Sequence, residues 1–325
     1  MSFQPKHRGF PGKKSVTFRI PNTNNQNFDH GWGFTASIGG GLAHFVQMDT
    51  GSRGVVVPAA VLGPKAVGPG PPGQIEYTSD GKIFLGHYYL TPLKLSAGGV
   101  SVTTVPIQVL GVQQAACDPA YPKCVVGKID GLGLIGVGFD RGTSGPAPPE
   151  LTNGFLALTG IVQGSMHPGY IVRAASVTLG LTSAGQAGYS RIPLQPGGTG
   201  PGDWNTESGC FGFPQISGYA SLCGTMLVDT GINSAILGLA RSQRPPSIPD
   251  TIPDGVSINF AAPSTVNPVA SYTFTTGSGE PPAPTSVRWA AGSAPFVNTG
   301  RNLIARFNYL FDDGSGRVGF KPATP

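Results

Sequence analysis

Short apolar segments alternate with clusters of Gly and Pro along the whole chain. These segments are rich in Val, Ile, Phe, Tyr and Thr, and their length and spacing are typical of antiparallel β-strands. The pattern predicts strands over residues 15–20, 42–48, 54–57, 83–90, 100–110, 170–181, 225–229, 256–261, 270–275, 303–311 and 317–320. The Gly- and Pro-rich clusters predict loops over residues 63–73, 196–204, 244–255 and 277–286. A helical period is weak everywhere, and residues 151–164 are the best candidate for a short helix.

The composition agrees with a mainly β protein. The 325 residues include 50 Gly and 32 Pro, a quarter of the chain, and both residue types destabilise a helix interior. Hydrophobic residues make up 39%, which is enough to form a large core and argues against general disorder. Gly shows no strict period of three, so collagen is excluded. The length allows one large domain or two medium ones.

Positive charge is concentrated at the N-terminus. Residues 1–20 carry five basic side chains and no acidic one, and the rest of the chain carries 16 of each sign. A nucleic-acid-binding protein would need a basic stripe on its folded body, so we expect no nucleic-acid partner. We interpret residues 1–20 as a basic arm or linker, with a prosegment remnant as a further hypothesis. No apolar signal core follows this arm, and no apolar run approaches the roughly 18 residues of a transmembrane segment.

The four cysteines form two local pairs. Cys117 and Cys124 are separated by six residues, and Cys210 and Cys223 by twelve. Neither pair has the C-x-x-C spacing of a zinc site and no His cluster accompanies them, so we predict two short-range disulfides and no bound metal. Disulfides favour an oxidising compartment, and we therefore expect a secreted or cell-envelope protein. The alternative is four buried thiols in a cytosolic protein.

One local motif occurs twice. Residues 45–58 read FVQMDTGSRGVVVP, and residues 225–239 read TMLVDTGINSAILGL. In each copy an apolar strand runs into Asp-Thr-Gly, and a second apolar strand follows a few residues later. Asp49 and Asp229 are 180 residues apart, a little over half of the chain. A motif that recurs at this spacing indicates two lobes, each contributing one copy to a shared centre.

Two carboxylates at such a centre would have a specific chemistry. If Asp49 and Asp229 approach within hydrogen-bonding distance, they cannot both ionise, and they share one proton. One carboxylate then acts as a base toward a water molecule while the protonated one polarises a carbonyl. The motif glycines are expected to allow close approach and unusual dihedral angles, and the threonines to donate hydrogen bonds across the lobe junction. These supporting residues are Thr50, Gly51, Thr230 and Gly231.

The doublet resembles the active-site segments of the pepsin-like, two-lobed aspartic proteases. DTGSRGVVVP at 49–58 is similar to the first segment of that family, and VDTGINSAIL at 228–237 is similar to the second. IEYTSDGKIFLG at 75–86 resembles the flap hairpin, in which Tyr77, Thr78 and Ser79 would contact substrate.

Two further segments extend the resemblance. IDGLGLIGVGFD at 129–140 is similar to the strand that supports the first aspartate, and NTGRNLIARFNYLFDDGSGRVGF at 298–320 is similar to the closing strand pair. The likeness covers residues 45–320 in patches. It is closest to compact bacterial members, including mycobacterial surface proteases with short cysteine loops.

The resemblance implies a mainly β, bilobal fold with two barrel-like lobes and a cleft between them. We expect lobes over residues 21–168 and 169–325, preceded by the arm of residues 1–20. The implied activity is hydrolysis of peptide bonds by a water that the Asp49/Asp229 dyad activates, without a cofactor or metal. The partner would be a peptide or protein substrate. A monomer is expected, because one chain carries both halves of the site.

Three departures from the family pattern keep a second interpretation open. Val55–Val57 replace the Trp that usually bonds the flap tyrosine, and Ile232 stands where Ser or Thr usually follows the second motif. Ser52 is present after the first motif, so Asp229 is expected to lack an outer donor that Asp49 has. A polar Asn298-Thr299-Gly300 replaces the second apolar-apolar-Gly element. This second interpretation is a catalytically silent protein that binds peptides or a partner in the cleft. A third, a β-rich surface or carbohydrate-binding module in which the Asp-Thr-Gly pair is coincidental, does not explain the other matching segments.

Overall fold

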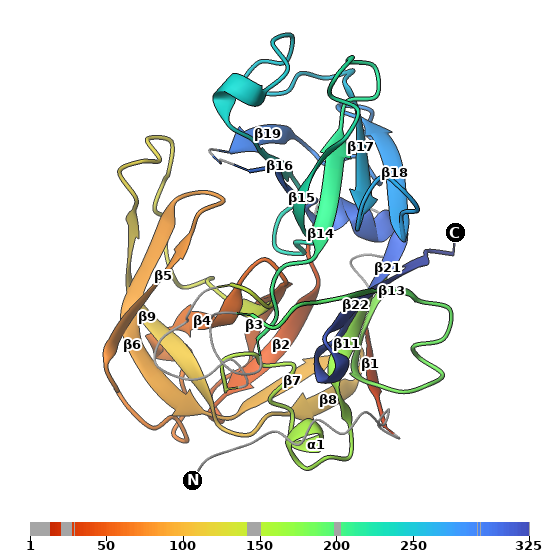
Figure 1. The fold of residues 1–325 in the computed structure, drawn as a ribbon. Helices are drawn as coiled ribbons and strands as arrows, with labels where there is room; N and C mark the ends of the chain where they lie inside the picture. The colour runs from red at the N-terminus through yellow and green to blue at the C-terminus, as the bar shows by residue number, and fades with distance from the viewer. Residues whose placement is uncertain are drawn as a thin grey trace.

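The structure, a computed structural model, describes residues 14–20, 28, 30–141, 151–197, 203–290, 292 and 294–324. Residues 1–13, most of the basic arm, lie outside this part of the chain. The described residues form three β-sheets, one short α-helix, α1 (Thr159–Val162), and several 3-10 helices of three to five residues. Figure 1 shows one sheet in red to yellow and a second in green to blue, with a third sheet beside both.

The first sheet has nine strands in the order β5-β6-β9-β4-β10-β3-β2-β7-β8. Its strands are β2 (Gly33–Ile38), β3 (His44–Asp49), β4 (Arg53–Pro58), β5 (Pro72–Tyr77), β6 (Lys82–Thr91), β7 (Leu93–Ala97), β8 (Val100–Thr103), β9 (Ile107–Cys117) and β10 (Leu134–Val137). The strand predicted over 100–110 is therefore two strands. Pro106, which has no N–H to donate to a ladder, lies in the break between them.

The second sheet has seven strands in the order β18-β17-β14-β15-β20-β16-β19. These are β14 (Ser208–Gly212), β15 (Leu222–Leu227), β16 (Ala235–Gly238), β17 (Ser257–Ala262), β18 (Ala270–Thr275), β19 (Val287–Ala290) and β20 (Phe296–Asn298). Its edge strand β19 faces the β5 side of the first sheet (Figure 1).

The third sheet joins segments from distant parts of the chain in the order β1-β12-β11-β21-β22-β13. Its strands are β1 (Val16–Arg19), β11 (His167–Arg173), β12 (Ser176–Leu181), β13 (Ser190–Pro193), β21 (Phe307–Asp312) and β22 (Arg317–Pro322). The last residues of the predicted arm are thus a sheet strand. The strand predicted over 170–181 is a hairpin, and residues 303–305 of another predicted strand belong to a 3-10 helix.

Aromatic side chains connect the sheets through a shared core. The rings of Phe34 and Phe155 have centroids 5.6 Å apart, those of Phe155 and Tyr170 are 5.7 Å apart, and those of Tyr170 and Phe311 are 5.5 Å apart. All four side chains are buried, so this line of contacts fixes the third sheet against the first.

The Asp-Thr-Gly repeat of the sequence corresponds to a repeated three-strand unit. In the first sheet β10 runs parallel to β3 and antiparallel to β4, and Gly136 pairs with Asp49. In the second sheet β20 runs parallel to β15 and antiparallel to β16, and Asn298 pairs with Leu227. The two units place the two motifs at corresponding positions of the two sheets.

Candidate active site

The two aspartates lie where the central strands of the repeated units end. Asp49 is the last residue of β3, and Asp229 follows the end of β15 by two residues. Their side chains are nearly inaccessible, with 5% of Asp49 and 6% of Asp229 exposed. The carboxyl groups are close enough for a side-chain hydrogen bond between them. The fold therefore brings together two carboxylates that the sequence separates by 180 residues.

Reciprocal threonine hydrogen bonds join the two loops. The backbone N–H of Thr50 donates to Oγ1 of Thr230 at 3.0 Å, and the N–H of Thr230 donates to Oγ1 of Thr50 at 3.0 Å. The Thr50 hydroxyl donates to the Val228 carbonyl, and the Thr230 hydroxyl donates to the Met48 carbonyl. Both threonines are buried, so these bonds are protected from water and fix the loops in register.

The motif glycines are required by close approach alone. A Cβ on Gly51 would overlap the carboxyl group of Asp229, and a Cβ on Gly231 would overlap the carboxyl group of Asp49. Neither glycine has a positive φ, so the expectation of unusual dihedral angles is wrong. Any side chain at these two positions would separate the aspartates.

Each aspartate accepts two hydrogen bonds from its surroundings. Asp49 accepts from the Gly51 N–H at 2.7 Å and from the Ser52 hydroxyl at 2.5 Å. Asp229 accepts from the Gly231 N–H at 2.8 Å and from Nδ2 of Asn298 at 2.6 Å. The expectation that Asp229 lacks an outer donor is therefore wrong, because a residue of β20 takes the place of a residue in the loop.

Burial and repulsion between the two carboxylates raise the pKa of one of them. Desolvation and the charge of Asp229 raise the pKa of Asp49 to about 7, although hydrogen bonds from Ser52 and Gly51 act in the opposite direction. At acid and near-neutral pH, Asp49 therefore carries a proton beside Asp229. A buried pair in this state can hold one acid and one base at the same point.

The aspartates lie at a cleft of about 1130 Å³ between the first and second sheets. The hairpin of β5 and β6 forms one wall, and its residues Tyr77, Thr78 and Ser79 line the cleft. The Tyr77 ring packs on Phe84, and its buried hydroxyl lies beside Ser52 without a well-formed hydrogen bond. Burial and the nearby Asp49 raise the pKa of Tyr77, so its hydroxyl stays protonated and can donate.

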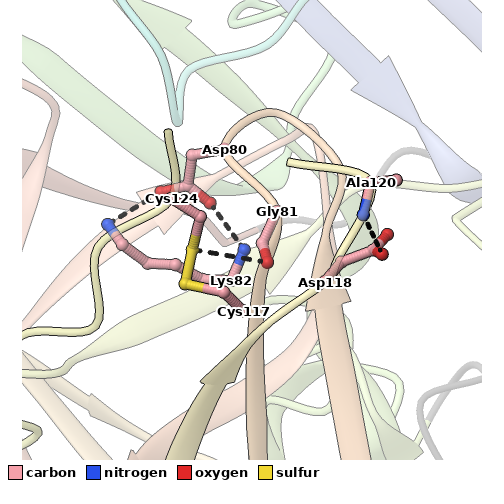
Figure 2. Close-up of a disulfide and its surroundings, with 7 residues drawn as sticks. All are labelled: Asp80, Gly81, Lys82, Cys117, Asp118, Ala120 and Cys124. Carbon is pink, nitrogen blue, oxygen red and sulfur yellow. Dashed lines mark hydrogen bonds and ion pairs between the residues drawn. A yellow bond between two sulfur atoms is a disulfide. The ribbon is translucent and has the colours of Figure 1, made fainter. Parts of the chain in front are cut away.

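A disulfide loop supports the turn of this hairpin. Cys117 and Cys124 are bonded, as predicted, and Figure 2 shows Cys124 next to the Gly81 carbonyl. The Asp118 N–H donates to that same carbonyl at 2.8 Å. The Tyr121 hydroxyl of the loop donates to the Thr78 carbonyl at 2.7 Å. The disulfide loop therefore fixes the position of the turn above the aspartates.

The second predicted disulfide, Cys210–Cys223, joins the paired strands β14 and β15 and is also present. No free cysteine occurs among the described residues. Two disulfides indicate an extracellular or otherwise oxidising compartment. In the described part of the chain, no helix is long and apolar enough to cross a membrane.

Two polar residues that the sequence did not reveal brace the second loop. Nε2 of Gln47 donates to the Gly231 carbonyl at 3.0 Å across the lobe junction. The buried Arg301 donates to the carbonyls of Gly231 and Ile232 at 2.6 and 3.1 Å. Gln47 precedes Asp49 by two residues, so its position on the same face of β3 was the one available signal. Within the described ranges, no group of three or more His, Cys, Asp or Glu side chains could hold a metal ion.

Comparison with known proteins supports the fold. No protein-family model matches the sequence, and no curated protein matches it either. Among solved structures, the crystal structure of an aspartic proteinase from Irpex lacteus is similar, with a TM-score of 0.60 and 13% identity. The match covers 96% of this chain and 98% of that one. The chain therefore has the two-lobed, mainly β fold of the pepsin-like aspartic proteinases.

Proposed function

We propose that the chain is an aspartic endopeptidase in which Asp49 and Asp229 share one proton. The observation that carries this proposal is the threonine-braced pair of buried carboxyls at the cleft, one of them with a pKa raised to about 7. Among the residues that the structure describes, no cation lies within ion-pair distance of either carboxylate. The shared proton is therefore the feature that makes the pair an acid and a base together.

The proposed reaction follows from the two protonation states. The ionised carboxylate accepts a proton from water, and the water oxygen attacks the peptide carbonyl carbon. The protonated carboxyl donates its proton to the carbonyl oxygen, which gives a neutral tetrahedral diol. The diol then returns a hydroxyl proton to a carboxylate as the carbonyl forms again, the other carboxyl protonates the amide nitrogen, and the C–N bond breaks. No covalent bond to the protein forms.

The Asp49/Asp229 dyad is tested by cleavage of a denatured protein between about pH 3 and 7. Wild type should cleave, and Asp229→Asn should lose cleavage because one proton acceptor is removed. Activity should also fall as the pH rises through about 7, because Asp49 then loses the shared proton. Asp254→Asn, at an exposed aspartate outside the cleft lining, is the matched control. Equal cleavage by wild type and Asp229→Asn would contradict the proposal.

A silent binding protein of the same fold is the second candidate. It is favoured by the Tyr77 hydroxyl, which lacks the partner that a Trp at Val55–Val57 would supply. Absence of cleavage by folded wild type, together with peptide binding in the cleft, would identify this candidate.

We propose lobes over residues 21–168 and 169–325, a monomer, and export to the cell surface or medium. The two disulfides support export, and the presence of both aspartate motifs in one chain supports a monomer. A bacterial surface subgroup is supported by the sequence segments alone.

A further inference from the structure

In the described part of the chain, four cationic side chains line the cleft, and three of them have partners within the protein. Arg53 is ion-paired with buried Asp203 at 2.7 Å, and Lys82 is ion-paired with Asp80 at 2.8 Å. The third, Arg141, donates to the carbonyl of Phe139 and to the hydroxyl of Thr206. Each of these three cations therefore has at least one side-chain partner or two neutral acceptors within the protein.

The fourth, Arg288, lies on the edge strand β19 of the second sheet. Its neighbours Val287 and Trp289 are buried, so the alternation of the strand directs Arg288 to the opposite face, into the cleft. One guanidinium N–H donates to the carbonyl of Ser79 at the flap turn, at 2.8 Å. Among the described residues, no carboxylate lies within ion-pair distance of Arg288.

This single hydrogen bond orients the guanidinium without satisfying it. An arginine has five N–H donors in a rigid, planar fork that fits a carboxylate with two parallel bonds. Ile236 of β16 pairs with Arg288 in the sheet, and Leu227 and Phe296 are further apolar residues of the cleft lining. A charged pair formed there would be screened less than one in open water.

No carboxylate of the flap hairpin forms an ion pair with Arg288. Asp80 is bonded to the ammonium group and the backbone N–H of Lys82, as Figure 2 shows. Glu76, on the same hairpin, is not within ion-pair distance of Arg288. Since no carboxylate of the described residues pairs with Arg288, its guanidinium is available to an acidic group on a bound ligand.

We propose that Arg288 is a specificity-determining residue that binds an acidic side chain of the peptide in the cleft. This inference rests on the proposed function and names its substrate class: peptides with a Glu or Asp at one fixed position near the scissile bond. The bond to Ser79 holds the guanidinium in place, so little side-chain freedom is lost on binding.

The test uses two matched sets of peptides that place a single Glu, or a single Gln, at each successive position around an apolar cleavage site. Wild type should prefer Glu over Gln at one position, by about tenfold to a hundredfold in kcat/KM at pH 5.5. Arg288→Met should lose this preference at that position alone. The preference should also fade at pH 3.5, where the Glu side chain is protonated.

A control separates ligand recognition from flap anchoring. Tyr121→Phe removes another bond to the flap turn, the one to the Thr78 carbonyl, without removing a charge. It should keep the preference for Glu. If wild type shows no preference at any position, or if Tyr121→Phe abolishes it as Arg288→Met does, Arg288 anchors the flap and the inference is wrong.

Binding distinguishes failure of this inference from failure of the proposed activity. The same peptides with a reduced, uncleavable bond are titrated by fluorescence anisotropy. Tighter binding of the Glu peptide to wild type, lost in Arg288→Met, would support the inference even if no peptide is cleaved. Cleavage with equal binding of the Glu and Gln peptides would overturn the inference and leave the protease proposal intact.

Discussion

Glu207 offers a sharp test of the electrostatics of the protein. It directly precedes β14 and is 3% exposed, and its Oε1 has no hydrogen-bond partner among the described residues. Burial raises its pKa from an ordinary 4.5 to about 7, with Arg141 acting against the shift and Asp140 adding to it. Tyr170 and Tyr309 are the buried titratable neighbours that respond to its charge. Replacing Glu207 by Gln keeps the size of the side chain and removes this titration.

The effect of Glu207 on stability depends on whether the folded or the unfolded protein binds its proton more tightly. Between pH 4.5 and about 7 the unfolded chain has lost the Glu207 proton and the folded protein has kept it, so stability falls as the pH rises. The difference of about 2.5 pH units, at about 1.4 kcal/mol each, amounts to about 3 kcal/mol. This loss of folding stability is absent below pH 4.5 and complete above pH 7.

Urea unfolding at pH 4.5 and pH 8 measures this contribution. The stability of wild type should fall between the two values by about 3 kcal/mol more than that of Glu207→Gln. Asp49 contributes a further loss of the same sign to both proteins, so it cancels in the comparison. Glu280→Gln, at an exposed glutamate, controls for the chemical change. Parallel pH profiles for wild type and Glu207→Gln would refute the reasoning.

Three further predictions test the remaining supports of the site. Asn298→Ala removes a donor to Asp229 and should lower kcat/KM about tenfold to a hundredfold, whereas an unchanged value would make that bond irrelevant to activity. Asp312→Asn weakens the buried 2.6 Å contact with His167 and should cost about 1–3 kcal/mol at neutral pH in urea unfolding. Although burial opposes ionisation, hydrogen bonds from His167 and Ser315 lower the pKa of Asp312, so its contribution is present at neutral pH and lost as the pH falls through that pKa. The difference between wild type and Asp312→Asn should therefore shrink in acid. The double variant Cys117→Ser/Cys124→Ser should release the flap turn and speed amide exchange over residues 78–82, whereas exchange as slow as in wild type would show that Tyr121 and Arg288 suffice.

The sequence predicted the parts of the structure that are coded locally. The strand over 270–275 has the predicted bounds, because alternate apolar residues between turn signals define it. The sequence predicts one strand over 170–181, and not the observed hairpin, because the turn consists of Ala174 and Ala175, which carry no turn signal. Residues 303–305, in the 3-10 helix Arg301–Ala305, fall within a predicted strand because Leu303 and Ile304 are as apolar as the residues of a strand. Periodicity cannot separate these cases in short segments.

The sequence reveals the side-chain hydrogen-bond donor to Asp49 but not the donor to Asp229. Ser52 lies three residues after Asp49, so comparison of the two motifs identifies it as a donor. Asn298 lies 69 residues after Asp229 and reaches it only because β20 pairs in parallel with β15, with Leu227 opposite Asn298. A comparison of the two loops alone therefore suggests that Asp229 has fewer hydrogen-bond donors than Asp49, although each has two. Because Asn298 supplies the donor, Ile232 is free to line the cleft as an apolar residue, and a departure that suggested a silent site is compatible with an active one.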